Sequence, residues 1–350
     1  MPQLLATLWT PAIWIKAMRE RQATFPALFN SGTVIQSDLM DGIASGAGTS
    51  ANIPFLKDIT DQDDEVQVEA NAPVNDLGAP GDVQNFPILN RVTKNSATAM
   101  AATVSGEDPV THVIESMTAR RLKQRQKTLI AILRGLLGTA GANAAAGAAL
   151  ADVRYGGTVQ EPFTENGAQA ADQYLMSPSI FIRSKALMGE LQDTLQNGCL
   201  LMHPDVKARL EELDALNFKT LIKPSELPFN ITTYRDIPLF LSQSLVRAGT
   251  QSGFVYDTYL IAKGTVGYGE RPQAADTKDL ASLAYFYDRD LNDDLIWDRT
   301  RFLMGVDGTS WIGNPAGSSA TNAELQTIAN WKRVYQTSNR CGVVAIRTNG

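Results

Sequence analysis

The chain has 350 residues, 44% hydrophobic and 19% charged, which is enough apolar material for one sizeable core or two smaller ones. The formal net charge of -6 argues against a nucleic-acid binder with an overall basic field. The two cysteines, Cys199 and Cys341, lack metal-type spacing and indicate a reducing compartment. We predict neither a secretory signal nor a membrane span, and therefore expect a soluble protein made in a cytoplasm.

The amino-terminal region divides into two parts. Apolar spacing over residues 11–27 predicts a short amphipathic helix. Residues 29–51 are rich in Ser, Gly and Asp and offer almost nothing to bury. We interpret this second part as a linker or an extended arm.

Residues 49–98 have a strand-like but poorly apolar pattern. Apolar residues 53–56 precede an acidic run at residues 61–65, and a second apolar run follows at residues 86–92. The two runs can pair across the turn-forming LGAPGD at residues 77–82. The pattern predicts a long hairpin that has too little apolar surface to fold alone, so it either packs on something else or stays mobile.

The next segment, residues 108–137, has helical spacing over about eight turns, which predicts the longest element, on the order of 40 Å. Five basic residues occupy its middle: Arg120, Arg121, Lys123, Arg125 and Lys127. These five side chains could contact nucleic-acid phosphates, or they could pair with acidic neighbours. The sequence is compatible with both roles. Residues 138–151 are rich in Gly and Ala and fit a helix end or an insertion.

Mixed structure is predicted for the rest of the chain. Residues 174–268 favour two helices, at residues 178–195 and 204–213, and strands at residues 199–203, 239–241 and 254–262. Residues 280–347 alternate apolar and polar side chains as strands do. Late strands beside a long central helix indicate the α+β class.

No catalytic or metal motif is complete in this sequence. His112 and His203 fit structural roles, and Asp288 to Asn292 mimics a calcium loop that lacks its glycine and its final glutamate. The glycines at 264, 267 and 269 fit a turn, because Pro272 follows where a phosphate-binding helix would start. We expect no catalytic site, no metal and no cofactor.

Several local stretches resemble a coat-protein family of tailed bacteriophages. They are SGTVIQSDLMDG with a following IPF, MHPDVKARLEELDALNF, YLIAKGTVGYGE, DRDLNDDLIWDRTRFLMGVDGTSW, and NAELQTIANWKRVY with a final VVAIRT. Their order along the chain is similar to that of major capsid proteins with the Hong Kong 97 (HK97)-like fold. This resemblance covers nearly the whole chain and rests on the order and number of the stretches.

The resemblance implies an α+β, HK97-like capsid fold in five segments. They are an N-terminal arm at residues 1–48, an extended β-hairpin loop (E-loop) at 49–98, a peripheral domain with a long spine helix at 99–172, an axial domain at 173–273, and C-terminal strands of the peripheral domain at 274–350. Residues 49–98 would then reach onto neighbouring copies. Candidate contact residues there are Phe55, Lys57, Asp61, Asp63, Asp64, Glu65 and Glu69.

The implied function is structural. Hexamers and pentamers of the chain would form an icosahedral head around double-stranded DNA in the virion, after assembly in the host cytoplasm. Expected partners are a separate scaffolding protein, a portal and a decoration protein, and no membrane. The alternatives are a shell protein of an encapsulin-like compartment or gene-transfer particle, and an enzyme with an unrecognised acidic site at Asp288, Asp290 and Asp294.

Overall fold

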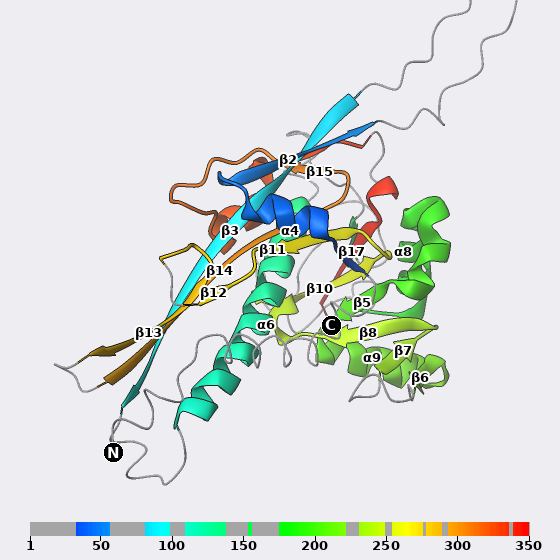
Figure 1. Ribbon diagram of the computed structural model, residues 1–350. Helices are drawn as coiled ribbons and strands as arrows, with labels where there is room; N and C mark the ends of the chain where they lie inside the picture. The colour runs from blue at the N-terminus through cyan, green and yellow to red at the C-terminus, as the bar shows by residue number, and fades with distance from the viewer. Residues whose placement is uncertain are drawn as a thin grey trace, which may run out of the picture.

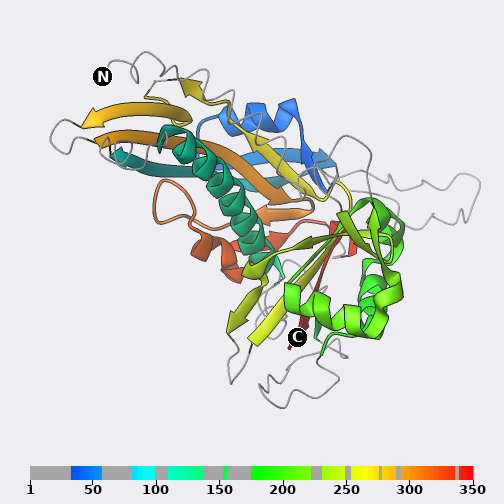
Figure 2. The same ribbon diagram turned by 90° about the horizontal axis from the view of Figure 1, so that it is seen from below.

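The computed structural model describes residues 33–56, 81–98, 109–137, 153–155, 175–221, 231–248, 254–275, 278–288, 293–335 and 339–349. Within these residues, two large sheets are joined by the long helix α6 (Pro109–Leu136). Figures 1 and 2 show α6 running along one face of the first sheet and ending beside the second. No helix in the described part is long and apolar enough to cross a membrane.

The first sheet is built around two long strands, β3 and β14. They pair antiparallel over eleven positions, from Ile88 opposite Leu303 to Thr98 opposite Asp293. Its strands are β1 (Val34–Gln36), β2 (Ser50–Leu56), β3 (Gly81–Thr98), β11 (Val266–Glu270), β12 (Ala274–Ala275), β13 (Ser282–Asp288) and β14 (Asp293–Val306). Strand β2 pairs only with β3, and the two form a hairpin at the edge of the sheet.

Helices cover opposite faces of this sheet. In β11, a Cβ added at Gly267 or Gly269 would meet Met40 of helix α4 (Asp38–Ser45), whereas Tyr268 and Glu270 lie toward α6. Successive side chains of a strand point to opposite faces, so α4 and α6 sandwich the sheet. Gly269 is needed here because its Cβ would lie 2.3 Å from the backbone oxygen of Met40.

The second sheet carries the helices of the other half of the molecule. Its strands are β4 (Val153–Tyr155), β5 (Cys199–Met202), β6 (Phe218–Leu221), β7 (Ile231–Tyr234), β8 (Ile237–Leu241), β9 (Val246–Ala248), β10 (Phe254–Ile261) and β17 (Val343–Thr348). Helices α8 (Pro178–Lys185) and α9 (Pro204–Asp214), and the 3-10 segment η2 (Ala186–Asn197), cluster beside it (Figure 2). Their buried residues form one core with buried side chains of β5, β8, β10 and β17.

A third group of short elements closes the carboxyl end of α6. These are β15 (Thr309–Trp311), α10 (Asn322–Gln326), the 3-10 segment η5 (Ile328–Asn330) and β16 (Trp331–Arg333). The other 3-10 segments lie elsewhere: η3 (Ala215–Asn217) contacts α9, η4 (Gln243–Leu245) contacts α6 and β10, and η6 (Asn339–Cys341) contacts η2. The Trp331 indole nitrogen donates to the Leu325 carbonyl at 2.8 Å, and the Trp331 ring meets Trp311 edge-on. Gly135 of α6 lies against Leu325 of α10 and Trp331 of β16, and a Cβ at this position would clash with both.

One hydrophobic core spans both sheets. It contains Leu89, Phe302 and Met304 of the first sheet and Leu201 and Tyr259 of the second, joined through the apolar residues 129–137 of the α6 region. The two halves therefore share buried surface.

The interpretation of residues 29–51 as a linker or extended arm is wrong for residues 38–45. They form α4, whose Ser37 side chain caps the helix by accepting from the Met40 N–H. The buried Arg301 guanidinium donates to the carbonyls of Ala44, Gly46 and Gly48, which holds the end of α4 on the sheet. The helix predicted at residues 11–27 lies outside the described residues.

The hairpin prediction is correct in kind and wrong in register. Ser50 pairs with Pro87 and Leu56 with Gly81, so part of the expected LGAPGD turn is strand. Residues 86–92 pair mainly with β14, and Phe86, Ile88 and Leu89 are buried. The base of the hairpin therefore belongs to the core of its own chain.

Helix α6 confirms the predicted longest helix, and β5 and α9 lie where residues 174–268 predicted them. The helix predicted at residues 178–195 is correct only as far as Lys185, where α8 ends and the 3-10 segment η2, kinked at Gly189, follows. The predicted glycine turn is correct at Gly264, which lies in a turn with a φ of 75°, and wrong at Gly267 and Gly269, which lie in strand β11. Strand β17 pairs with β10 in the second sheet, whereas the division at residue 274 predicted it in the sheet of β13 and β14.

Candidate intersubunit surface

The β2–β3 hairpin extends beyond the body of the molecule (Figure 1). At its outer end Leu56 is 73% exposed. Phe55 packs edge-on against Tyr335 with ring centroids 5.6 Å apart, and the Tyr335 hydroxyl donates to Asp307 at 2.7 Å. The chain itself thus braces Phe55, while the hairpin end offers unburied apolar surface.

The other predicted contact residues in this loop lie outside the described residues. They are Lys57, Asp61, Asp63, Asp64, Glu65 and Glu69. Their role in contacts between copies stays a prediction.

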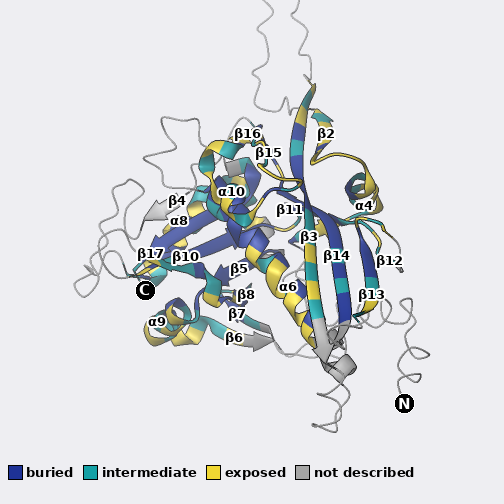
Figure 3. Cartoon of the chain, turned by 90° about the vertical axis from the view of Figure 1, so that its left-hand side faces the viewer, coloured by how far each residue is buried: buried dark blue, intermediate teal, exposed yellow. Residues whose placement is uncertain are grey.

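The five basic residues of α6 divide between two faces. Arg120, Lys123 and Lys127 are exposed and recur at helical spacings of three and four residues. Arg121 and Arg125, four residues apart, are buried at 8% and 6% exposure. Figure 3 shows α6 with exposed positions in its earlier part and buried positions toward its carboxyl end.

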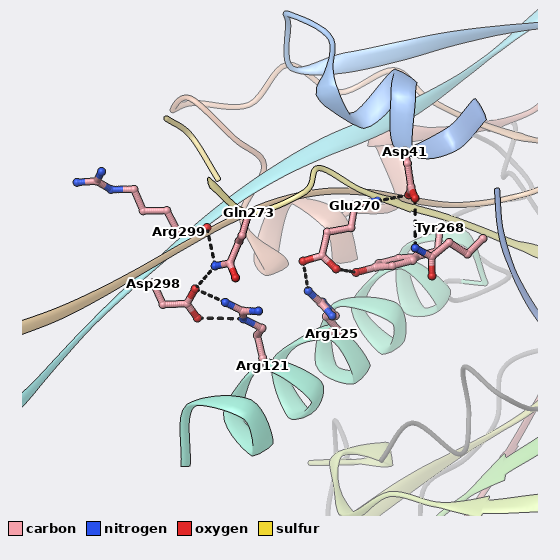
Figure 4. A network of polar contacts seen from close by, with 9 residues as sticks. Asp41, Arg121, Arg125, Tyr268, Glu270, Gln273, Asp298 and Arg299 are labelled. Carbon is pink, nitrogen blue, oxygen red and sulfur yellow. Dashed lines mark hydrogen bonds and ion pairs between the residues drawn. The ribbon is translucent and has the colours of Figure 1, made fainter. Parts of the chain in front are cut away.

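Arg121 pairs with Asp298 of β14 (Figure 4). Its Nε donates to Asp298 Oδ2 at 3.0 Å, and a second nitrogen contacts Oδ1, so the pair is bidentate. Gln273 donates to the same Oδ1 at 2.9 Å. This network ties α6 to the first sheet.

Arg125 extends the connection through the sheet to α4. It pairs with Glu270, which also accepts from the Tyr268 hydroxyl at 2.8 Å. The Glu270 backbone N–H donates to Asp41 of α4 at 2.8 Å. Burial raises the pKa of Tyr268 well above its ordinary value, so this phenol stays a hydrogen-bond donor.

The carboxyl end of α6 meets the second sheet at a buried carboxylate. Asp257 of β10 is fully buried and pairs with Arg134 at 3.2 Å, Arg247 at 3.3 Å and Arg347 at 3.2 Å. Arg347 also donates to the Leu137 carbonyl at the end of α6. Acidic neighbours therefore account for Arg121 and Arg125, while the exposed Arg120, Lys123 and Lys127 keep both of their explanations.

The remaining candidate residues form no site in the described part of the chain. His203 caps α9 by accepting from the Asp205 N–H at 3.2 Å, and no metal-type cluster of His, Cys, Asp or Glu occurs among the described residues. Asp290 and the side chain of Asp294 lie outside the described residues, so the acidic site is not tested.

Sequence reasoning missed the carboxylates that face α6, Asp298, Glu270 and Asp257. These carboxylates lie on strands more than a hundred residues from their arginine partners in α6, a distance that no local pattern reports. One usable signal was present: Arg121 and Arg125 share the buried stripe that continues through Thr128.

Three comparisons relate this structure to known proteins. The chain is 24% identical over 313 residues to the major capsid protein of Bacillus phage SPP1, covering 88% of this chain and 87% of that protein. The Cyanophage Pam1 capsid subunit has a similar fold, with a TM-score of 0.56, 12% identity and 93% coverage of both chains. The capsid of Ralstonia phage GP4 gives a TM-score of 0.57 at 11% identity, covering 92% of this chain and 90% of that one.

No protein-family model matches the chain. The structural similarity spans both sheets and α6, because it covers nine tenths or more of each chain. The fold is therefore the HK97-like fold of phage capsid subunits, as the resemblance predicted.

Proposed function

We propose that this chain is a major capsid protein, a structural phage shell protein that self-associates into hexamers and pentamers of an icosahedral head enclosing double-stranded DNA. The observation that carries the proposal is the joint agreement of sequence and fold with capsid subunits over about nine tenths of the chain. In this role the chain acts through contacts between copies and performs no catalysis.

The exposed end of the β2–β3 hairpin supports the proposal. An edge strand with an uncovered apolar end is a ready-made surface for a second chain. We infer that Phe55, Lys57 and the acidic residues through Glu69 contact neighbouring copies. Many weak contacts of this kind sum to a stable closed shell.

The exposed basic side chains of α6 can form a second contact surface. Arg120, Lys123 and Lys127 form a row on the helix, and such rows bind phosphates without sequence preference. In the proposed head they face packaged DNA or a neighbouring copy. A scaffolding protein, a portal and a decoration protein complete the proposed particle, which assembles in the host cytoplasm.

Electron microscopy of the purified chain, alone and co-expressed with its scaffold, tests the proposal. We expect capsomers or closed shells of uniform size. A stable monomer under every assembly condition would contradict it. Nuclease-protected DNA in particles from infected cells distinguishes a phage head from the alternative, a protein-filled compartment of encapsulin type.

A further inference from the structure

A cleft of about 190 Å³ opens between α6 and the strands β3 and β14. This volume is well above the roughly 10–15 Å³ that one water molecule needs. Four arginines line the cleft, together with polar and apolar side chains of the three elements. They are Arg91, Arg120, Arg121 and Arg125.

The charges around the cleft do not balance. Arg121 is compensated by Asp298 and Arg125 by Glu270. Arg91 and Arg120 have no ion-pair partner among the described residues, which leaves an excess of two positive charges.

Arg91 is held in place by neutral groups. Its Nη1 donates to the Asn90 carbonyl and to Ser319 Oγ, both at 3.1 Å, and its Nη2 donates to the Ala320 carbonyl at 2.8 Å and to Asn322 Oδ1 at 3.3 Å, so both Nη groups are fully engaged. Because burial removes water from this cation, the pKa of Arg91 lies below its ordinary value. An anion beside it would offset that loss of hydration.

Arg125 supplies an independent indication of a missing ligand. Its Nη2 serves the ion pair with Glu270, whereas its Nε is buried and has no hydrogen-bond partner among the described residues. Buried donors of folded proteins are almost always satisfied, so an unpartnered one on a cleft wall points to an acceptor that binds there.

We propose that this cleft binds a carboxylate side chain from a second copy of the chain, with Arg120 and the Nε of Arg125 as its donors and Arg91 as a neighbouring positive charge. The inference rests on the proposed function, because a closed shell places copies side by side. The receptor chemistry is that of arginine toward a planar oxyanion.

A carboxylate fits better than a nucleic-acid phosphate for two reasons. Arg121 and Arg125 are almost fully buried, so a narrow side chain reaches them more easily than the broad backbone of a duplex does. The chain also has six more acidic than basic residues, so every neighbouring copy brings carboxylates in excess.

Zero-length cross-linking tests the site directly. Arg120→Lys keeps the charge and adds an amine that carbodiimide couples to a carboxylate in contact with it. Isotope-labelled and unlabelled copies of this variant are mixed, assembled and cross-linked, and the peptides are identified by mass spectrometry. We expect mixed-isotope peptides joining position 120 to an Asp or Glu of another copy.

A matched pair of variants measures the contribution to assembly. Arg120→Gln removes a positive charge from the wall of the cleft. Lys123→Gln removes the same charge from an exposed position of the same helix that does not line the cleft. We expect Arg120→Gln to need roughly tenfold more protein to form shells than Lys123→Gln does, with unchanged circular dichroism for both.

Each contrary outcome has a distinct meaning. Shells that form without any cross-link between copies overturn the site and leave the proposed function standing. Protection of the introduced amine from acetylation only in DNA-filled shells assigns the cleft to phosphate and also overturns the proposal. A chain that forms no shells overturns the proposed function and this site together.

Discussion

Asp257 is a single carboxylate surrounded by three guanidinium groups in the interior of the molecule. A buried ion pair adds little net stability compared with an apolar pair, but removal of one partner leaves an uncompensated buried charge. At Asp257 a small chemical change is therefore expected to have a large effect on stability.

We expect Asp257→Asn to lower the free energy of unfolding by about 3–5 kcal/mol. Urea denaturation followed by circular dichroism measures it. The control is Asp236→Asn, which breaks the exposed pair with Lys219, where the side chains are 68% and 59% exposed, and should lose less than about 1 kcal/mol. Equal losses in the two variants would mean that the Asp257 cluster is no more critical than a surface pair.

Glu324 gives a prediction about pH. The backbone N–H groups of Thr321 and Ala316 donate to its carboxylate and hold the pKa of Glu324 below its ordinary value. A depressed folded-state pKa contributes stability above the unfolded pKa of about 4.3, and that stability is lost as pH falls through the folded value.

Replacement of Glu324 by Gln keeps a capping-box side chain and removes the titrating group. We expect the Tm of Glu324→Gln to lie below that of the natural chain at pH 7 and the two to converge as the pH falls below about 4. Scanning calorimetry across this range checks the result. Melting curves that stay equally separated at every pH would show that the carboxylate contributes nothing through its charge.

Residue types alone could predict part of this picture. The basic cluster of α6 was visible in the sequence, but which side chain faces a carboxylate depends on long-range partners such as Asp298 and Glu270. Arg91 and Arg301 gave no local signal, because their acceptors are carbonyls and neutral side chains brought close by folding.

At the scale of elements, strand β3 has two different parts. Residues 88–98 pair with β14, whereas residues 81–87 pair with β2. Phe86 lies in the part that pairs with β2, yet it is only 2% exposed. Deleting the whole segment from residue 61 to residue 87 would remove the buried Phe86 as well as the exposed part of the hairpin. The loop must therefore be tested with a narrower change.

Leu56 and Gly81 are register partners, so residues 57–80 can be replaced by Asn-Gly, which closes a two-residue hairpin. We expect the variant to keep the unfolding free energy of the natural chain and to lose shell formation, as seen by denaturation and electron microscopy. For comparison, Phe86→Ala should cost about 3–5 kcal/mol. A loop variant that unfolds like Phe86→Ala would place the loop in the core.

The elements that the sequence predicted best are those with long periodic patterns, above all α6. Helix α4 was missed because it has eight residues, with Gly42 in its middle and only Ala44 fully buried. It is stabilised by contacts that lie elsewhere in the chain, the donors of Arg301 and the glycines of β11. Local propensity is a weak guide for such an element.

For the whole molecule, the core shared by both sheets predicts one unfolding transition. Trp297, in β14, reports on the first sheet, Trp311 and Trp331 report on the elements at the carboxyl end of α6, and Cys199, in β5, reports on the second sheet. Burial raises the pKa of the Cys199 thiol to about 12, so it should react with a thiol reagent only after unfolding. In a Cys341→Ser background, we expect tryptophan fluorescence and Cys199 labelling to share one urea midpoint.

Two separate midpoints would show that the sheets unfold independently despite their common core.

The order of segments was enough to predict the α+β class and the HK97-like fold. It did not predict that β17 crosses into the second sheet, because a strand pattern reports which face is buried but not which partner it pairs with.

Helix α6 is fastened by buried charges at two places, in its middle to the first sheet through Arg121 and Arg125, and near its carboxyl end to the second sheet through Arg134. A change in the angle between the sheets would have to break one of these pairs. In a particle built from five-fold and six-fold rings, each copy must still fit two slightly different settings. The body of the subunit then behaves as a stiff strut, and the adjustment falls to the outermost pairs of the β2–β3 hairpin.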